Sequence, residues 1–191
     1  MARTYKVAVV VGSLRKESIN RKAALALAGM APDTLDLEIV EIGDLPLYDE
    51  DAEAAGPPQA WERFRREIAA ADAVLFVTPE YNRSIPGALK NAVDVASRPY
   101  GSGAWSGKPA AVMSISAGAM GGFGANHQLR QALVFLDMPV LQQPEAYVGG
   151  GFTLFDEQGE IAAEGTRAFF QTFIDAFANW IERTAAPESG G

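Results

Sequence analysis

Residues 12–20, Gly-Ser-Leu-Arg-Lys-Glu-Ser-Ile-Asn, contain several side chains of the kinds that bind phosphate groups. The segment follows a short β-branched run at 7–11 and precedes an Ala- and Leu-rich helical pattern. A strand-to-helix loop presents unpaired backbone N–H groups and the positive end of the helix dipole, which both favour an anion. The candidate ligands are Ser13, Arg15, Ser18 and Asn20. The spacing fits neither a P-loop nor Gly-x-Gly-x-x-Gly, so a solvated turn with Ser18 as helix cap stays the alternative.

Two later loops also carry unusual residues, and each follows an apolar run. Residues 78–94 read Thr-Pro-Glu-Tyr-Asn-Arg-Ser-Ile-Pro-Gly-Ala-Leu-Lys-Asn-Ala-Val-Asp, in which Pro79 ends the strand. Residues 116–124 read Ser-Ala-Gly-Ala-Met-Gly-Gly-Phe-Gly, and small residues let a backbone approach a planar ligand closely. The alternatives are a turn into a helix capped near Ser84 for the earlier loop and a flexible connector for the later one.

The elements that position these loops alternate between strands and helices. We expect strands at residues 7–11, 36–42, 73–78, 110–115 and 140–148, the last interrupted by Pro144. We expect helices at residues 20–30, 59–71, 87–97 and 126–136, and one through the aromatic stripe from Phe169 to Ile181. This alternation predicts a parallel sheet with helices on both faces. Ligands of such sheets bind beyond the carboxyl ends of the strands, where the three loops should meet.

Composition excludes several other kinds of function. The 191 residues contain no cysteine and one histidine, and the formal net charge is −8, which opposes nucleic acid and anionic membrane. No apolar run is long enough to span a bilayer, so we expect a cytoplasmic protein. We expect residues 1–184 to form one domain, residues 185–191 a disordered tail, and residues 43–58 an acidic loop. The carboxylates of that loop are Asp49, Glu50, Asp51 and Glu53, and we interpret them as solvated charge, with no metal site.

The first two loops together resemble a known family. The pattern Gly-Ser-Leu-Arg…Ser…Asn is similar to the FMN-phosphate loop of the NADPH-dependent FMN reductase family, which includes bacterial quinone, chromate and azobenzene reductases. Residues 79–94 resemble that family's Pro-Glu-Tyr-Asn-x-Ser-x-Pro-Gly-x-Leu-Lys-Asn-x-x-Asp signature nearly throughout. Further similarity lies at residues 45–49, 107–109 and 129–131, so the resemblance covers roughly residues 6–150.

The resemblance implies a flavodoxin-like α/β three-layer sandwich with strand order 2-1-3-4-5, and an enzyme that binds FMN. It implies cofactor contacts from Ser13, Arg15, Ser18, Ile19, Asn20, Pro79, Glu80, Tyr81, Asn82, Ser116 and Gly118. Backbone amides of the second loop could hydrogen-bond the pyrimidine edge of the flavin, with Tyr81 as an aromatic wall. Because the flavin carries the chemistry, we expect no catalytic side chain. Arg83, Tyr48 and Arg98 are weaker candidates for contacts with the nicotinamide nucleotide or the substrate.

The implied reaction is a ping-pong cycle. NADPH or NADH reduces the flavin, and a quinone, an azo or nitro compound, a flavin or an oxidised metal ion such as chromate then takes the electrons. The alternative is an electron-carrier flavodoxin that does not oxidise NAD(P)H, and Arg15 with the Pro-Glu-Tyr-Asn segment argues against it. A flavin-free receiver module would need an aspartate where Thr78 and Pro79 stand.

The family resemblance also implies a homodimer or homotetramer. The helix at 87–97 and the loop at 45–50 would contribute to the subunit contact, and Lys90 could pair with Asp94 within the helix or across subunits. Arg83 stands where some relatives have tyrosine, and neither Gly124 nor His127 matches the Arg and Tyr associated with the tetramer contact and acceptor access. We therefore expect His127 at a helix surface or an interface, and neither a tetramer nor a chromate preference follows from these positions.

Overall fold

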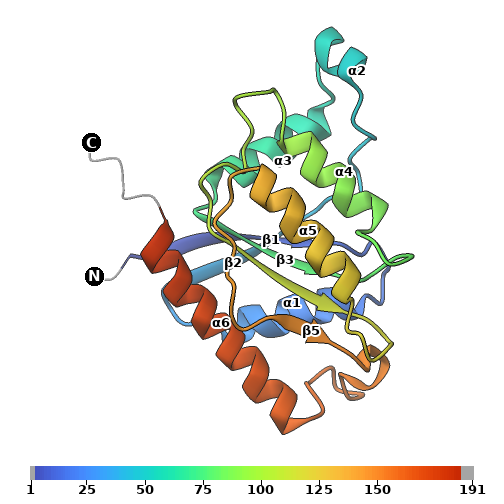
Figure 1. Ribbon diagram of the computed structural model, residues 1–191, viewed down its shortest axis with the longest axis vertical. Helices are drawn as coiled ribbons and strands as arrows, with labels where there is room; N and C mark the ends of the chain where they lie inside the picture. Colours follow the sequence, from blue (N-terminus) through green and yellow to red (C-terminus); the bar gives the residue numbers. More distant parts are fainter. Residues whose placement is uncertain (1–2, 186–191) are drawn as a thin grey trace.

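The computed structural model describes residues 3–185 and contains a five-stranded parallel sheet with strand order β2-β1-β3-β4-β5 (Figure 1). The strands are Tyr5–Val11 (β1), Leu35–Val40 (β2), Ala73–Thr78 (β3), Ala110–Ile115 (β4) and Ala146–Val148 (β5). The helices are Ile19–Met30 (α1), Glu50–Ala55 (α2), Gln59–Ala70 (α3), Gly87–Ala96 (α4), Phe123–Phe135 (α5) and Glu164–Thr184 (α6), with a short 3₁₀ helix at Gly151–Thr153 (η1). The predicted fold class and strand order are confirmed.

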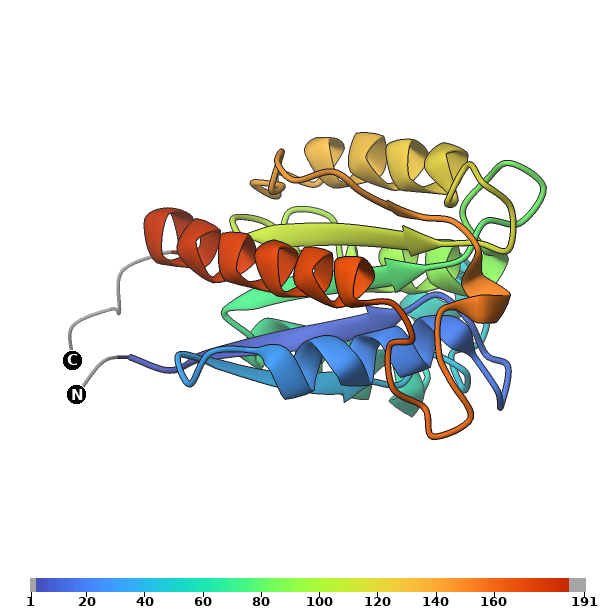
Figure 2. The ribbon, with the colours of Figure 1, turned by 90° about the horizontal axis from the view of Figure 1, so that it is seen from below.

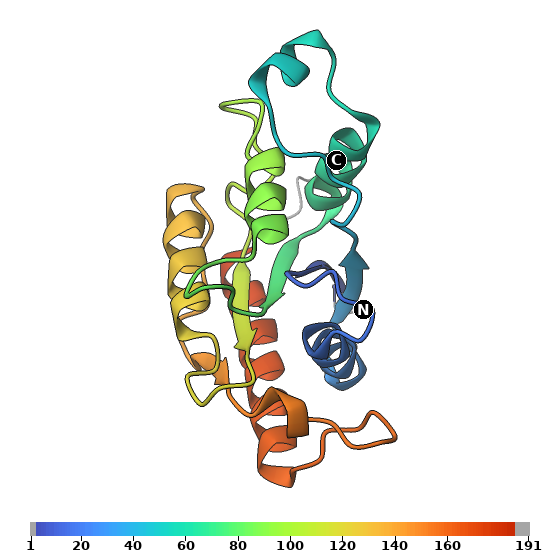
Figure 3. The same cartoon turned by 90° about the vertical axis from the view of Figure 1, so that its right-hand side faces the viewer.

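The central strands are apolar because both of their faces are covered. Every residue of β3 and β4 is buried, whereas the edge strand β2 is buried only at its two end residues and is exposed or half-buried between them. Successive β1 side chains enter opposite cores: Val7 and Val9 pack with α1 and α6, and Ala8 and Val10 pack with α3, α4 and α5. Figure 3 views the sheet nearly end-on, with these helices on its two sides.

Two sequence predictions for the elements were wrong. Residues 43–58 were predicted as a loop, but they contain α2, whose N-terminus is capped by the Asp49 side chain. Glu53 of α2 accepts hydrogen bonds from Arg65 of α3, so a tertiary contact stabilises a helix that has no buried residue. The strand predicted at 140–148 is confined to β5, because Pro144 interrupts it and Val140 forms only an isolated bridge with Ala110.

The remaining boundaries agree closely with the sequence predictions. The helix α5 begins at Phe123, three residues before the predicted start, and α6 extends beyond both ends of the aromatic stripe from Phe169 to Ile181. Of the predicted tail at 185–191, only Ala185 lies within the described residues. Among residues 3–185, no helix is long and apolar enough to cross a membrane.

Candidate flavin site

The three polar loops lie together at the carboxyl end of the sheet (Figure 2). The Gly12 amide donates to the Val77 carbonyl at 2.9 Å, which joins the first loop to the end of β3. A Cβ on Gly12 would lie 2.6 Å from Thr78 Oγ1, so only glycine lets these two chains approach so closely. Asn20 Nδ2 donates to the Ile115 carbonyl at 3.5 Å, which joins the start of α1 to the end of β4. The structure thus brings the three predicted loops to one edge.

The first loop has the features of a phosphate site. The Ser18 hydroxyl accepts a hydrogen bond from the Arg21 amide at 3.1 Å and caps α1, as the alternative interpretation also proposed. That contact uses the hydroxyl as an acceptor and leaves its hydrogen available for an anion. No acidic residue lies in the first turn of α1, so the helix dipole is not neutralised there. The Arg15 side chain is exposed and has no ion-pair partner among the described residues.

Asn20 contributes a buried polar atom that the protein leaves unsatisfied. Its Oδ1 has no hydrogen-bond partner among residues 3–185, although the side chain is only 5% exposed. A buried acceptor without a donor destabilises a fold, and such an atom at the start of α1 suits a ligand hydroxyl. The ribityl chain of FMN carries hydroxyls next to its phosphate, so the residues of this loop fit that cofactor.

A cavity of about 400 Å³ adjoins the first loop on the side of β2. Arg15, Lys16 and Arg21 line it from one side, and Glu41 lines it from the other. Arg21 donates to Glu41 at 2.6 Å, and this hydrogen bond raises the pKa of the Arg21 guanidinium. Arg15 and Lys16 therefore supply the unneutralised positive charge beside the loop.

The second loop forms a tight turn. The Tyr81 amide donates to the Ser84 carbonyl at 3.0 Å, and the Ser84 amide donates back to Tyr81 at 2.9 Å. Asn82 and Arg83 between them have φ values of 51° and 65°, the left-handed conformation of both central residues in a type I′ turn. Tyr81 is 49% exposed, so its ring is accessible to a ligand. Pro79 directs the chain from β3 into this turn.

The Glu80 side chain turns away from the first loop and toward α5. Its Oε2 accepts a hydrogen bond from the Ala125 amide at 3.0 Å, and its Oε1 lies 3.6 Å from Arg83 Nη1. Gln128 of α5 also contacts the turn, since its Nε2 donates to the Arg83 carbonyl at 2.9 Å. Gln128 could not be singled out from the sequence, because an exposed glutamine on a helix is ordinary. The Glu80 side chain is therefore occupied by contacts within the protein, and only its backbone remains available to a ligand.

The third loop is anchored at several points, which argues against a flexible connector. Ser114 Oγ donates to the Gly121 carbonyl at 2.7 Å, and the Gly151 amide donates to the Ser116 carbonyl at 3.0 Å. A Cβ on Gly121 would lie 2.5 Å from the Tyr147 backbone, whereas one on Gly118 would meet nothing within 4 Å. Gly118 therefore faces open space at the predicted cofactor contact.

The three candidates for contacts with the nicotinamide nucleotide or the substrate, Arg83, Tyr48 and Arg98, do not form one cluster within a single chain. Arg98 lies 5.9 Å from the centre of the Tyr48 ring, so these two residues form one group. Arg98 follows the C-terminal end of α4, and the Tyr48 amide donates to Asn91 in the middle of this helix at 2.9 Å. Arg83 precedes the N-terminal end of α4, and ten helical residues span about 15 Å. His127 is exposed, as expected, and its Nε2 lies 2.8 Å from the Tyr147 hydroxyl.

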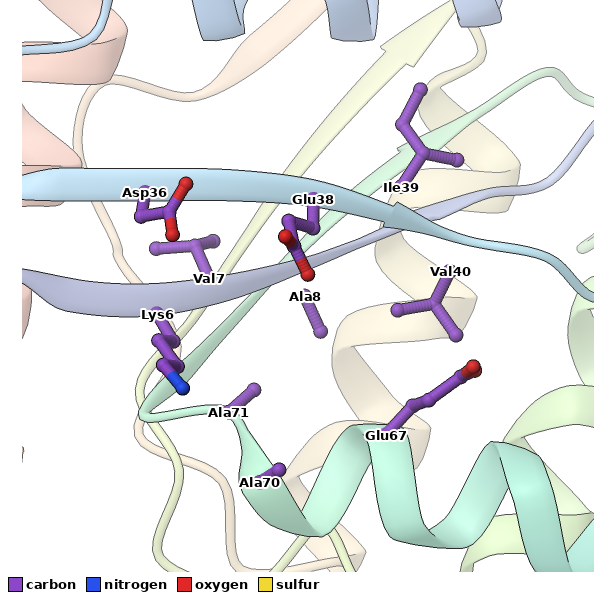
Figure 4. A pocket seen from close by; sticks show the side chains of 10 residues that line it. All are labelled: Lys6, Val7, Ala8, Asp36, Glu38, Ile39, Val40, Glu67, Ala70 and Ala71. Carbon is purple, nitrogen blue, oxygen red and sulfur yellow. The ribbon is translucent and has the colours of Figure 1, made fainter.

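Another cavity, of about 310 Å³, lies between β2, β1 and α3 (Figure 4). Its charged lining residues are Lys6, Asp36, Glu38 and Glu67. Three carboxylates against one amine repel a phosphate, so this cavity is a poor nucleotide site. Among residues 3–185, no cluster of His, Cys, Asp or Glu side chains could hold a metal ion.

A flavodoxin-like sheet that brings three such loops together at its carboxyl end, one of them suited to an anion, is typical of proteins that bind flavin mononucleotide. The family model of the NADPH-dependent FMN reductases matches residues 5–153. The chain belongs to that family.

Comparisons with known proteins agree with this assignment. The chain is 65% identical to a quinone reductase of Pseudomonas putida, over 97% of this chain and 100% of the relative. It is 47% identical to a 2-hydroxy-1,4-benzoquinone reductase of Burkholderia sp, over 92% of this chain and 96% of the relative. The solved structure of FerB, a flavoenzyme NAD(P)H:(acceptor) oxidoreductase from Paracoccus denitrificans, matches with a TM-score of 0.90 and 42% identity, over 96% of this chain and all of FerB. The predicted class, an FMN-dependent NAD(P)H oxidoreductase, is confirmed, and the electron-carrier alternative is not favoured.

Proposed function

We propose that this protein is an NAD(P)H:quinone oxidoreductase that works through FMN held at the carboxyl end of its sheet. The single observation that carries the proposal is the juxtaposition of three features with the loops after β3 and β4: the positive end of the α1 dipole, which no acidic residue of the first turn neutralises, exposed Arg15, and the unsatisfied Asn20 acceptor. Relatives named as quinone reductases, one of them 65% identical, support the choice of acceptor.

Each loop has a separate task in this proposal. Ser13, Arg15, Ser18 and Asn20, with the backbone of Ile19, hold the phosphate and the ribityl chain. The backbone of the Pro79–Asn82 segment holds the pyrimidine edge of the ring through the Glu80 and Asn82 amides, because the Tyr81 amide donates to Ser84, and Ser116 and Gly118 pack beside the ring. Bound FMN supplies the acceptor for the nicotinamide hydride and the donor for the quinone. The protein contributes binding and orientation, and no side chain acts as a nucleophile.

The donor and the acceptor use the same open face in turn, which makes the cycle ping-pong. Exposed Tyr81 borders that face, and a flat quinone can stack on its ring. Arg83 is our candidate for a contact with the phosphates of NADPH or NADH. Azo and nitro compounds, free flavins and chromate are further acceptors that such an open face admits.

We propose that the working unit is a homodimer or homotetramer of one-domain chains, with residues 1–184 as the domain. Tyr100 lies beside Arg98, Leu47 precedes Tyr48 in the chain, and these two apolar side chains are 86% and 80% exposed. If a second copy of the chain bound here, Tyr48 and Arg98 of one subunit could lie close to the flavin of the other. Lys90 and Asp94 already pair within α4 at 2.7 Å, which favours the intrahelical role for them. Because NAD(P)H is the donor, we place the reaction in the cytoplasm.

The test begins with purified protein from which flavin has been removed. The apoprotein is titrated with FMN, and the reconstituted protein is then mixed anaerobically with NADPH or NADH. We expect rapid bleaching of the flavin absorbance and its return when a quinone is added, with parallel double-reciprocal plots at several quinone concentrations. Flavin that binds but stays yellow with both donors would instead support the electron carrier. An apoprotein that ignores FMN would overturn the proposal.

A further inference from the structure

Gln128 uses both ends of its side-chain amide on the turn of the second loop. Its Nε2 donates to the Arg83 carbonyl at 2.9 Å, and its Oε1 accepts from Ser84 Oγ at 2.6 Å. Gln128 belongs to α5 and lies 44 and 45 positions away from these two residues in the sequence. The amide thus joins two neighbouring groups of the turn to one helix.

Two further contacts bring the same helix against the same turn. A Cβ on Gly124 would lie 2.8 Å from both the Arg83 carbonyl oxygen and Glu80 Oε2, so glycine permits this close approach. The Ala125 amide donates to Glu80 Oε2 at 3.0 Å. The beginning of α5 is therefore the support on which residues 80–84 rest.

The turn requires such support because of its backbone conformation. Asn82 and Arg83 both have positive φ values, and a long side chain such as arginine rarely adopts that conformation. Residues in sparsely populated regions keep them only when surrounding contacts enforce them. The two Tyr81–Ser84 backbone hydrogen bonds close the turn, and Gln128 is the side chain that holds the Arg83 carbonyl from outside it, so loss of this contact lets the peptide groups of the turn shift.

We propose that Gln128 is a positioning residue for the flavin, which it orients through the Tyr81–Ser84 turn without touching it. This inference rests on the proposed function, in which the backbone of residues 79–82 holds the pyrimidine edge of the ring. Hydrogen bonds at that edge affect both the affinity for FMN and the electron density of the ring. Gln128 thereby sets the flavin midpoint potential as well as the binding constant.

The experiment compares Gln128→Ala with Gln131→Ala, a matched control. Gln131 is an exposed glutamine one turn further along α5, and its side chain makes no hydrogen bond among the described residues. Ser84→Ala is a milder variant, because it removes one of the two contacts and leaves the Arg83 contact in place. The readouts are the FMN dissociation constant by calorimetry, the flavin absorption spectrum, the midpoint potential and the far-ultraviolet circular dichroism.

We expect Gln128→Ala to raise the dissociation constant about tenfold and Ser84→Ala about threefold. We also expect an altered spectrum and midpoint potential for Gln128→Ala, with wild-type circular dichroism, and no change for Gln131→Ala. Wild-type affinity, spectrum and potential in a folded Gln128→Ala variant would overturn the inference while the proposed function stands. If Gln128→Ala does not fold, the test rests on Ser84→Ala. A Ser84→Ala protein with wild-type FMN affinity and wild-type flavin spectrum would then overturn the inference. If wild-type apoprotein binds no FMN, the proposed function fails first and this inference with it.

Discussion

The Glu80 carboxylate caps α5, since its Oε2 accepts a hydrogen bond from the Ala125 amide at 3.0 Å. Gly122, at the N-cap position of α5, has no side chain to perform this task. A carboxylate from the loop after β3 therefore satisfies a free amide at the start of the helix after β4, and its charge also complements the helix dipole. The hydrogen bond that caps α5 therefore also joins two of the loops of the candidate flavin site.

Replacing Glu80 by alanine should lower the free energy of unfolding by about 1 kcal/mol, because an N-terminal cap of a helix is lost. Glu80→Gln keeps a side-chain oxygen as acceptor and should cost less. Chemical denaturation followed by circular dichroism measures both variants. Glu182→Ala is the control, because Glu182 is exposed near the end of α6. A Glu80→Ala protein as stable as this control would refute the capping role.

Replacing Arg15 by alanine should weaken FMN binding about tenfold, because one charge-assisted contact to the phosphate is lost. The side chain is exposed and has no ion-pair partner among the described residues, so the fold should be unaffected. Titration of apoprotein with FMN measures the effect. Riboflavin, which lacks the phosphate, is the internal control and should bind wild type and Arg15→Ala equally. Equal loss of both ligands would show that Arg15 acts elsewhere.

Much of the fold could be predicted from the sequence because the central strands are buried on both faces. The apolar runs Ala73–Thr78 and Ala110–Ile115 coincide with β3 and β4, and Pro79 marks the end of β3. The helix α2 could not be predicted in this way. Its residues are acidic and exposed, and the ion pair between Glu53 and Arg65 that stabilises it joins residues twelve positions apart on different elements.

The same limit applies to the candidate site. The loop that follows each strand could be placed, because parallel strands end at one edge of the sheet. The direction of the Glu80 side chain and the contacts of Gln128 could not, since they join residues about 45 positions apart. The separation of Arg83 from Arg98 likewise depends on the length and direction of α4, which residue types alone do not reveal.

Gly12→Ala should destabilise the protein by about 1–3 kcal/mol, because the new Cβ would lie 2.6 Å from the buried Thr78 Oγ1. Gly29→Ala is the matched comparison. Gly29 is exposed near the end of α1, and a Cβ there meets nothing within 4 Å, so this variant should gain about 0.5 kcal/mol from helix propensity. Thermal and urea unfolding measure both. Equal effects of the two substitutions would contradict the close approach of β1 and β3 at this position.

Tyr147 should make the stability of the protein depend on pH in the alkaline range. Burial, followed by the neighbouring Glu145 carboxylate, raises the pKa of the Tyr147 hydroxyl to about 12, although nearby Arg130 acts in the opposite direction. An unfolded tyrosine ionises near pH 10. Between about pH 10 and 12 the unfolded state therefore loses a proton that the folded state keeps, and the free energy of unfolding falls as pH rises. Below pH 10 this contribution is fully present.

The variant Tyr147→Phe removes the ionising group, so its stability should fall less steeply than that of wild type between pH 10 and 12. Urea unfolding at several pH values measures the two slopes. The ultraviolet difference spectrum between wild type and Tyr147→Phe isolates the titration of this residue from that of the other tyrosines. A Tyr147 titration near pH 10, with parallel stability curves, would mean that the hydroxyl is solvated and that burial and Glu145 do not raise its pKa.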